Sequence, residues 1–358
     1  MVFRVLRRVL AALLALPRPL KRRLAGPEIT RDGQTLDLDV QVVLRLLGLL
    51  ARGEEPSLVD QRRATDEAAA LSVATTSGVA ARPTTVPVPA GPGRDVPGAV
   101  AACLYEPAEV GDAPGGLLVH FHGGGFALGS IASSAPLCRA LAHQAGVRVL
   151  SVEYRLAPEH PFPAGLADAA SALHHVLTHR DEFRATTVAV GGDSAGANLA
   201  LTAAHQLARR DHETASFVLA LYPVTDAGRQ GGSRETFAEG FGLRTVDIEV
   251  FERYYLPDGI EPVRPTGLLE VGDLAIMPPC YVATAGFDPL RDEGEELAGA
   301  LRVAGVPVVA RRFPGLVHGY AGFAGIVPTA RDAVLDAASA LRAGLALTTT
   351  RERLADSL

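Results

Sequence analysis

The stretch TTVAVGGDSAGANLALTAAHQLA, residues 186–208, decides the fold and raises the main functional question. The β-branched and apolar residues at its start are typical of a buried strand, and the alanine- and leucine-rich run at its end is typical of a helix. Ser194 stands between Gly192 and Gly196, where the strand must turn into the helix. The glycines alone fit a tight connection of small residues. The serine between them fits a nucleophile held on a strained turn.

The pentapeptide from Gly192 to Gly196 has the form G-x-S-x-G and occurs once in the chain. A predicted strand before it and a predicted helix after it form the context in which this motif marks a nucleophilic serine. Flanking glycines let the turn pass its neighbours without clashes, and the helix N-terminus adds positive potential beside a developing oxyanion. The motif therefore predicts Ser194 as a nucleophile above the edge of a sheet.

Strand-like and helix-like runs alternate along the chain on both sides of this motif. The runs predicted as buried strands are 115–121, 147–154, 186–192, 216–223, 280–287 and 306–313. The helix-like runs are 133–145, 164–179, 196–209, 289–304 and 328–346. Strands that alternate with helices predict an α/β fold, with a mostly parallel sheet covered by helices on both faces.

Composition divides the chain into an α/β domain and three further parts. Residues 1–75 form an N-terminal helical segment, which ends at a stretch rich in Thr, Pro and Gly. Residues 76–224 and 276–347 form the α/β domain. Residues 225–275 interrupt the alternation with many Gly, Arg and Glu residues, which predicts an inserted cap. Residues 348–358 form a polar tail that we expect to fray.

The overall composition is that of an ordinary globular protein of 358 residues, with 48% hydrophobic and 21% charged residues. The net charge of −6 argues against nucleic acid as a partner, because phosphate binding needs a basic face. Cys103, Cys138 and Cys280 form neither a disulfide framework nor a zinc-site pattern. We therefore expect buried free thiols and a cytoplasmic location.

Residues 1–25 combine basic side chains with an apolar run. The run is too short to span a bilayer, and the sequence PRPLKRR after it fits a secretory signal poorly. An apolar stripe at helical spacing predicts an amphipathic helix instead. Two alternatives stay open for this helix: packing on its own domain, or reversible contact with a membrane surface. The sequence also leaves open whether the chain forms a homodimer.

A nucleophilic serine needs a base, and three histidines follow Ser194 in the chain. His205 lies well along the helix that begins at the serine, about 16 Å away, and His212 lies farther in the same direction. Only His318 remains, in the sequence FPGLVHGYAGF directly after a predicted strand. His318 is therefore the predicted base.

The acid that orients the histidine is expected on a loop after a strand, between the serine and the histidine in the chain. Asp288 directly follows the strand predicted over 280–287, in the sequence VATAGFDPLRDEGEEL. Asp292 already lies in the following helix, so Asp288 is the predicted acid. An N-cap role is an alternative for Asp288, because D-P-L opens a helix well, and one residue can hold both roles.

The sequence HGGG at residues 122–125 follows another predicted strand and is expected to supply an oxyanion hole. Its glycines let backbone N–H groups turn toward one point without a side chain in the way. The predicted donors are the amides of Gly124, Gly125 and Ala195, with Gly123 as an alternative to either loop glycine. His122 is expected to be a buried hydrogen-bonding residue that shapes the loop.

These motifs together resemble those of one known family. They are HGGGF, YRLAPEHPFPA, GDSAGANLA, DPLRDEGEEL and HGY, at residues 122–126, 154–164, 192–200, 288–297 and 318–320. In the order, spacing and residues of these motifs, the chain resembles the hormone-sensitive-lipase-like carboxylesterases, the bacterial family IV esterases. The opening ITRDGQTLDLDVQVVLRLL resembles the N-terminal cap segment of actinobacterial members.

The resemblance implies an α/β-hydrolase fold whose cap is built from residues 1–75 and the 225–275 insertion. It implies Ser194 as nucleophile, Asp288 as acid and His318 as base of a serine carboxylesterase that cleaves short- to medium-chain esters. Such a mechanism requires no metal or organic cofactor, and the implied partner is a small-molecule ester. Two alternatives stay open: a non-catalytic ligand-binding protein on the same scaffold, and an amidase or acyltransferase with the same triad.

Overall fold

The structure is a computed structural model that describes residues 2–50, 56–69, 78–211, 214–256 and 274–355. In this part of the chain, eight strands form one sheet in the order β10-β9-β8-β7-β5-β6-β4-β3. Their bounds are Val79–Val88 (β3), Gly98–Pro107 (β4), Gly115–Phe121 (β5), Arg148–Val152 (β6), Ala185–Asp193 (β7), Phe217–Leu221 (β8), Cys280–Phe287 (β9) and Val308–Val317 (β10).

Strands β5 to β10 pair in parallel, which confirms the predicted mostly parallel sheet. Strands β3 and β4 were not expected from the sequence, and they pair antiparallel at one end of the sheet. β3 contains Pro83 and Pro87, within the stretch rich in Thr, Pro and Gly that follows the N-terminal segment. A proline has no N–H to donate, and an edge strand tolerates it because one side of that strand needs no partner.

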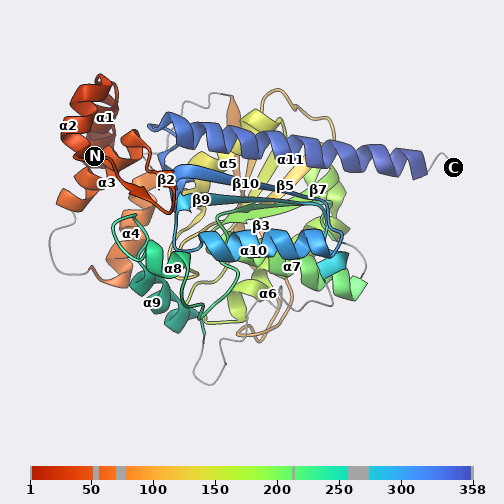
Figure 1. Cartoon of the computed structure of the whole chain (residues 1–358). Helices are drawn as coiled ribbons and strands as arrows, with labels where there is room; N and C mark the ends of the chain where they lie inside the picture. The colour runs from red at the N-terminus through yellow and green to blue at the C-terminus, as the bar shows by residue number, and fades with distance from the viewer. Residues whose placement is uncertain (1, 51–55, 70–77, 212–213, 257–273, 356–358) are drawn as a thin grey trace.

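Helices cover both faces of the sheet, as Figure 1 shows: α5 and α11 lie on one face, and α6, α7 and α10 lie on the other. Their bounds are Ile131–Ala145 (α5), Ala164–Thr178 (α6), Ala195–Asp211 (α7), Arg291–Val303 (α10) and Pro328–Ala355 (α11). The expected helix end at residue 346 is wrong, because α11 continues to Ala355. A helix propagates easily once formed, and no Gly or Pro interrupts the polar run at its end.

The N-terminal segment consists of α1 (Val2–Leu14), α2 (Arg18–Ala25), the hairpin β1–β2 (Thr30–Arg31 and Gln34–Thr35), α3 (Leu38–Leu50) and α4 (Leu58–Ala68). Leu10 and Leu14 of α1 are buried in the same apolar core as α11 and one face of the sheet. Each fully buried leucine stabilises such packing by about 2 kcal/mol. The apolar stripe of α1 thus packs on its own domain. Among the described residues, no helix is long and apolar enough to cross a membrane.

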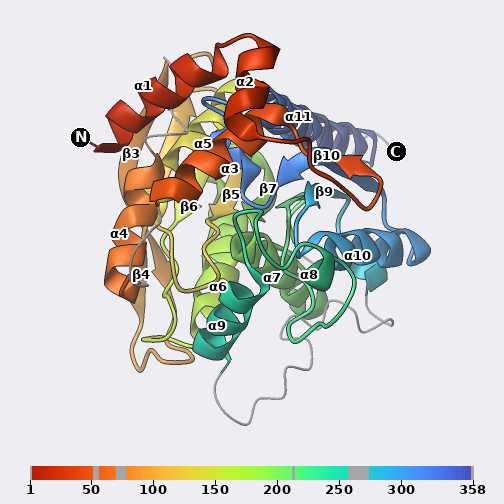
Figure 2. The ribbon, with the colours of Figure 1, turned by 60° about the vertical axis from the view of Figure 1, so that its left-hand side comes forward.

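The predicted insertion lies only partly within the described residues, because 257–273 fall outside them. Its described part holds α8 (Ser233–Thr236) and α9 (Thr245–Tyr255), the latter as predicted from VDIEVFERYYL. Figures 1 and 2 show α8, α9 and α4 at the end of the sheet where the parallel strands have their carboxyl ends. Three short 3-10 helices complete the described elements, at Arg180–Phe183, Leu274–Ile276 and Tyr320–Phe323.

The three cysteines are buried and unbridged, as expected. Cys103 lies on β4, Cys138 on α5 and Cys280 on β9. Burial raises the pKa of the Cys138 and Cys280 thiols to about 12, so both stay protonated and unreactive.

Candidate active site

Ser194 sits in the turn between β7 and α7 with a φ of 54°, a left-handed conformation that strains a residue with a side chain by about 1–3 kcal/mol. The two glycines of the motif are required by close contacts. A Cβ on Gly196 would lie 2.0 Å from the carbonyl oxygen of Phe121, and a Cβ on Gly192 would lie 2.4 Å from the same atom. The turn therefore passes directly over the end of β5, which only glycine permits.

Backbone hydrogen bonds hold this strained turn in place. The amide of Ser194 donates to the carbonyl of Leu221, at the end of β8, over 2.9 Å. The side chain of Asn198, in the first turn of α7, donates to the carbonyl of Val224 over 2.9 Å. The turn is thus tied to the end of β8 and to the segment that follows β8, so the serine side chain is pre-positioned before any substrate arrives.

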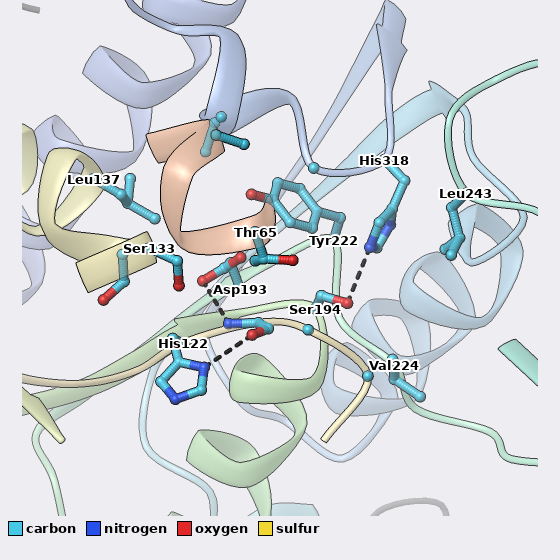
Figure 3. Close-up of a pocket in the computed structure, with 18 of the residues that line it drawn as sticks. Thr65, His122, Ser133, Leu137, Asp193, Ser194, Tyr222, Val224, Leu243 and His318 are labelled. Atoms are coloured by element: carbon cyan, nitrogen blue, oxygen red, sulfur yellow. Dashed lines mark hydrogen bonds between the residues drawn. The ribbon is translucent and has the colours of Figure 1, made fainter. Parts of the chain in front are cut away.

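The three residues predicted as a triad lie in one hydrogen-bonded chain. The Oγ of Ser194 lies 3.0 Å from Nε2 of His318, and the contact is drawn in Figure 3. The Nδ1–H of His318 donates to Oδ2 of Asp288 over 2.8 Å. Asp288 is fully buried, and its other oxygen accepts the amide of Leu290 over 2.8 Å. The carboxylate therefore orients the imidazole and also caps the turn that follows it.

The sheet topology explains why residues so distant in sequence meet. Ser194, Asp288 and His318 directly follow β7, β9 and β10, which lie close together in one parallel array. The carboxyl ends of parallel strands share one edge of the sheet, so their following loops converge. His205 lies in α7, away from this edge, and Asp292 instead accepts the amide of Ser233 over 2.8 Å.

Tyr222 belongs to the site and was missed by sequence reasoning. It follows β8, between the strands that carry the serine and the acid, and its ring stands edge-on to His318 at 5.0 Å between centroids. Its φ of 36° and its burial show that packing, not local preference, sets its position. No motif in the sequence marks this tyrosine, because its contacts are all with distant residues.

The HGGG loop is held from both sides. The amide of Gly123 donates to Oδ1 of Asp193 over 3.1 Å, and the Nδ1–H of His122 donates to the Gly123 carbonyl over 2.9 Å. The hydroxyl of Tyr154 donates to the carbonyl of His122 over 2.8 Å, and the two rings stack at 4.4 Å. The amide of Gly123 is thus already engaged, which leaves Gly124, Gly125 and the elbow amide as the predicted donors.

Two glycines of this loop have backbone conformations that other residues rarely adopt. Gly124 has a φ of 122°, and a Cβ there would lie 2.3 Å from the carbonyl oxygen of Leu128. Gly125 has a φ of 59°, and a Cβ there would lie 2.4 Å from the ring of Phe251 in α9. The glycine run therefore permits both the tight loop and the close approach of α9.

Burial shifts the charge states around the loop. It lowers the pKa of His122 to about 4, so the ring is neutral at pH 7 and its tautomer is set by the Gly123 carbonyl. Burial also raises the pKa of Asp193 to about 6, while the Gly123 amide and His318 oppose the shift. Asp193 is therefore mostly ionised at neutral pH and available as an acceptor. The sequence motif contains Asp193 but does not reveal this bond to the loop.

A cavity of about 400 Å³ opens above the serine. Figure 3 shows Thr65, Ser133 and Leu137 on one side of Ser194, and Leu243 and Val224 on the side of His318. Its remaining walls include residues of α9 and of the loop after His318. Elements far apart in the sequence thus close one mostly apolar cavity over the hydrogen-bonded chain.

Comparison with known proteins agrees with this architecture. A protein-family model described as alpha/beta hydrolase fold matches residues 118–322, from β5 to beyond His318. The chain is also similar to the carboxylic ester hydrolase LipN of Mycobacterium tuberculosis, with 39% identity over 319 residues, which cover 85% of this chain and 82% of that relative. The chain belongs to the α/β-hydrolase family, in its hormone-sensitive-lipase-like branch.

Solved structures resemble this α/β-hydrolase over nearly their whole length. A thermostable esterase from Pseudomonas putida ECU1011 matches with a TM-score of 0.80 and 29% identity, over 88% of this chain and 99% of that chain. The hyperthermophilic esterase from the archaeon Pyrobaculum calidifontis matches with a TM-score of 0.77 and 32% identity, over 86% of this chain and 98% of that chain. The likeness therefore covers most of this chain and nearly all of each solved structure.

Proposed function

We propose that this α/β-hydrolase is a serine carboxylesterase that cleaves short- to medium-chain carboxylic esters. The hydrogen-bonded chain from Ser194 through His318 to Asp288 is the observation that carries the proposal. The esterase names of its relatives support the same reaction class. Neither the triad chemistry nor the proposed water step requires a metal or organic cofactor.

Acylation begins with attack of the Ser194 Oγ on the ester carbonyl. Nε2 of His318 takes the serine proton, and the Asp288 carboxylate stabilises the imidazolium that forms. The imidazolium then gives its proton to the leaving alcohol oxygen, and the acyl group stays on the serine. In deacylation, His318 takes a proton from water, the hydroxide attacks the acyl carbon, and the serine regains its proton as the acid leaves.

The tetrahedral oxyanion would be bound by the amides of Gly124, Gly125 and Ala195. Gly123 is excluded from the proposed set because its amide donates to Asp193. The amide of Ala195 belongs to the first turn of α7, where the helix dipole adds positive potential. Removing one such donor typically costs about 3 kcal/mol of transition-state stabilisation.

The position of His318 assigns the two sides of the cavity. The imidazolium must reach the leaving oxygen, so the alcohol part of the ester lies on the His318 side, with Leu243 and Val224. The acyl part then extends toward Thr65 and Leu137. A cavity of about 400 Å³ supports short and medium acyl chains as substrates.

The test is initial-rate hydrolysis of 4-nitrophenyl esters from acetyl to palmitoyl by the wild type and by Ser194→Ala. We expect turnover of the shorter esters and a loss of about 10³-fold or more in the variant. Ser339→Ala, an exposed serine of α11, is the matched control and should leave the rates unchanged. A wild type inert on every ester, but active on amides or in acyl transfer, would favour an amidase or acyltransferase; ligand binding without turnover would favour a binding protein.

Two predictions about partners stay proposals. Arg18 and Arg23 are exposed on the same helix as Leu20, which is 42% exposed, and Arg8 is exposed on α1. These residues support reversible contact with an anionic membrane surface through residues 1–25. Co-sedimentation with anionic vesicles that is lost in Arg18→Glu/Arg23→Glu would support the contact. Equal binding of the wild type and the variant would end the idea.

The proposed homodimer is tested by measuring the molecular mass of the protein in solution. The proposed cytoplasmic location is supported by the buried free thiols.

A further inference from the structure

The cavity above the serine carries charge of one sign. Among the described residues that line it, the acidic side chains are Asp193 and Glu252, and no lysine or arginine is present. Asp193 is bound to the HGGG loop, so it belongs to the proposed machinery. Glu252 lies on α9, in the inserted segment, and has no role in the proposed reaction steps.

Glu252 lies on the face of α9 that closes the cavity. Ile248, Phe251 and Glu252 all line it, at positions i, i+3 and i+4 of the helix, and Phe251 packs against the HGGG loop. The Glu252 side chain is 19% exposed, so a substrate in the cavity can approach its carboxylate. Leu243, just before α9, lies on the His318 side of the serine, which is the side of the leaving alcohol.

The cation bound to Glu252 is shared with a second carboxylate. Arg234 donates to Oε1 of Glu252 over 3.3 and 3.4 Å, and to the fully buried Glu293 over 2.9 and 3.2 Å. Arg234 is itself buried and does not line the cavity. One guanidinium thus serves two carboxylates, and the group that faces the cavity is the acidic one. A low-dielectric cleft lined by one sign of charge focuses its field on a bound ligand.

We propose that Glu252 makes the alcohol side of the cavity select esters with a neutral or cationic alcohol part over esters with an anionic one. This inference rests on the proposed esterase function and adds the charge class of its substrate. A cationic group near Glu252 gains attraction, and an anionic group meets two carboxylates with no lysine or arginine in the described walls. Arg234 donates both to Glu252 and to the carbonyl of Asp226, two residues past Val224, and Val224 lies on the His318 side of the serine. The selection therefore acts on the alcohol part, which occupies that side.

The test compares acetylcholine with 3,3-dimethylbutyl acetate, which has the same shape and acyl group but no charge. The measured quantity is the ratio of kcat/KM for the cationic ester to kcat/KM for the neutral one, at pH 8. This ratio cancels any difference in the amount of folded enzyme. Burial raises the pKa of Asp193 to about 6 and that of Glu293 to about 7, so both are ionised at this pH.

In Glu252→Gln we expect the ratio to fall about five-fold, as for one unit charge acting over about 8 Å at an effective dielectric constant of about 40. Hydrolysis of 3-acetoxypropanoate, the anionic probe, should rise in the same variant. Glu249→Gln is the matched control, because Glu249 lies on the exposed face of the same helix and makes the same change in net charge. Its ratio should equal that of the wild type.

Leu243→Lys gives a second, independent variant that leaves the Arg234–Glu252 contact intact and adds a cation to the same wall. Its ratio should fall as well. An unchanged ratio in both Glu252→Gln and Leu243→Lys, or an equal fall in Glu249→Gln, would overturn the proposal. A wild type inert on the neutral ester would instead overturn the proposed esterase function, so the two failures are distinguishable.

Discussion

The serine elbow and the helices that close the cavity are built in different ways. The elbow, from β7 through Ser194 to α7, is held by backbone hydrogen bonds and by glycines whose Cβ positions are filled by other backbone atoms. The closing helices α4 and α9 are attached mainly by side chains. Arg62 of α4 donates to the carbonyls of Ala127 and Ala157, and its guanidinium pairs with Glu159.

This difference in construction separates the residues that carry out the reaction from the residues that select the substrate. The glycines of the elbow tolerate no side chain, because backbone atoms fill their Cβ positions, so the reacting groups keep one geometry. Side-chain contacts can be exchanged one at a time, so the walls of the cavity can vary while the elbow stays constant. Substitutions in the first region should therefore affect turnover or folding strongly, and substitutions in the second should affect substrate binding moderately.

Asp288→Asn should have the largest effect. It removes the charge that stabilises the imidazolium and disturbs the tautomer of His318, so kcat should fall about 10³-fold or more while the fold is kept. Initial-rate assays with 4-nitrophenyl acetate measure kcat, and circular dichroism shows whether the fold is kept. Asp292→Asn is the control, since Asp292 contacts Ser233 and Arg291 instead of the histidine. Comparable losses in both variants would contradict the assigned acid.

Gly196→Ala should disrupt the elbow itself. The added Cβ would lie 2.0 Å from the Phe121 carbonyl, and relief requires the backbone to shift, so we expect a loss of about 3 kcal/mol or more in unfolding free energy. Urea denaturation followed by fluorescence or circular dichroism measures it. Gly299→Ala in α10 is the control, because a Cβ there meets nothing within 4 Å, and it should stabilise by up to about 1 kcal/mol.

Asp193 should give the elbow region a pH dependence. Its carboxyl binds a proton more tightly in the folded state, with a pKa of about 6, than at its ordinary value of 3.8. The stability that this proton contributes is fully present below pH 3.8 and is lost as the pH rises through about 6. The unfolding free energy of the wild type relative to Asp193→Asn should therefore fall by about 3 kcal/mol from acid to neutral pH. A pH-independent difference would show that the carboxyl is not shifted.

Arg62→Ala should have the smallest effect and act on binding. It removes the contacts that fasten α4, whose Thr65 and Ala68 line the cavity. We expect KM to rise about three- to five-fold, roughly 1 kcal/mol, with kcat nearly unchanged. Arg63→Ala is the control, because Arg63 makes a surface pair with Asp60 and should leave KM unchanged. A fall in kcat without a change in KM would break the division between the two regions.

The sequence by itself determined the elbow, the parallel sheet and the three residues that meet at its edge. The G-x-S-x-G motif is local, and its meaning depends only on the strand and helix directly beside it. The alternation of strands and helices then sends every strand end to the same edge, so Asp288 and His318 could be predicted from their order in the chain and from their place after a strand. Their role in catalysis is a proposal that the activity of the variants will test.

Only the tertiary structure decided the rest. The bond from Gly123 to Asp193, the ring of Tyr222 against His318 and the edge strand β3 with its prolines all depend on partners distant in the sequence. Periodicity and motifs describe each segment alone and carry no information about such partners. The charge of the cavity walls is the same kind of fact, because it depends on which face α9 turns toward the serine.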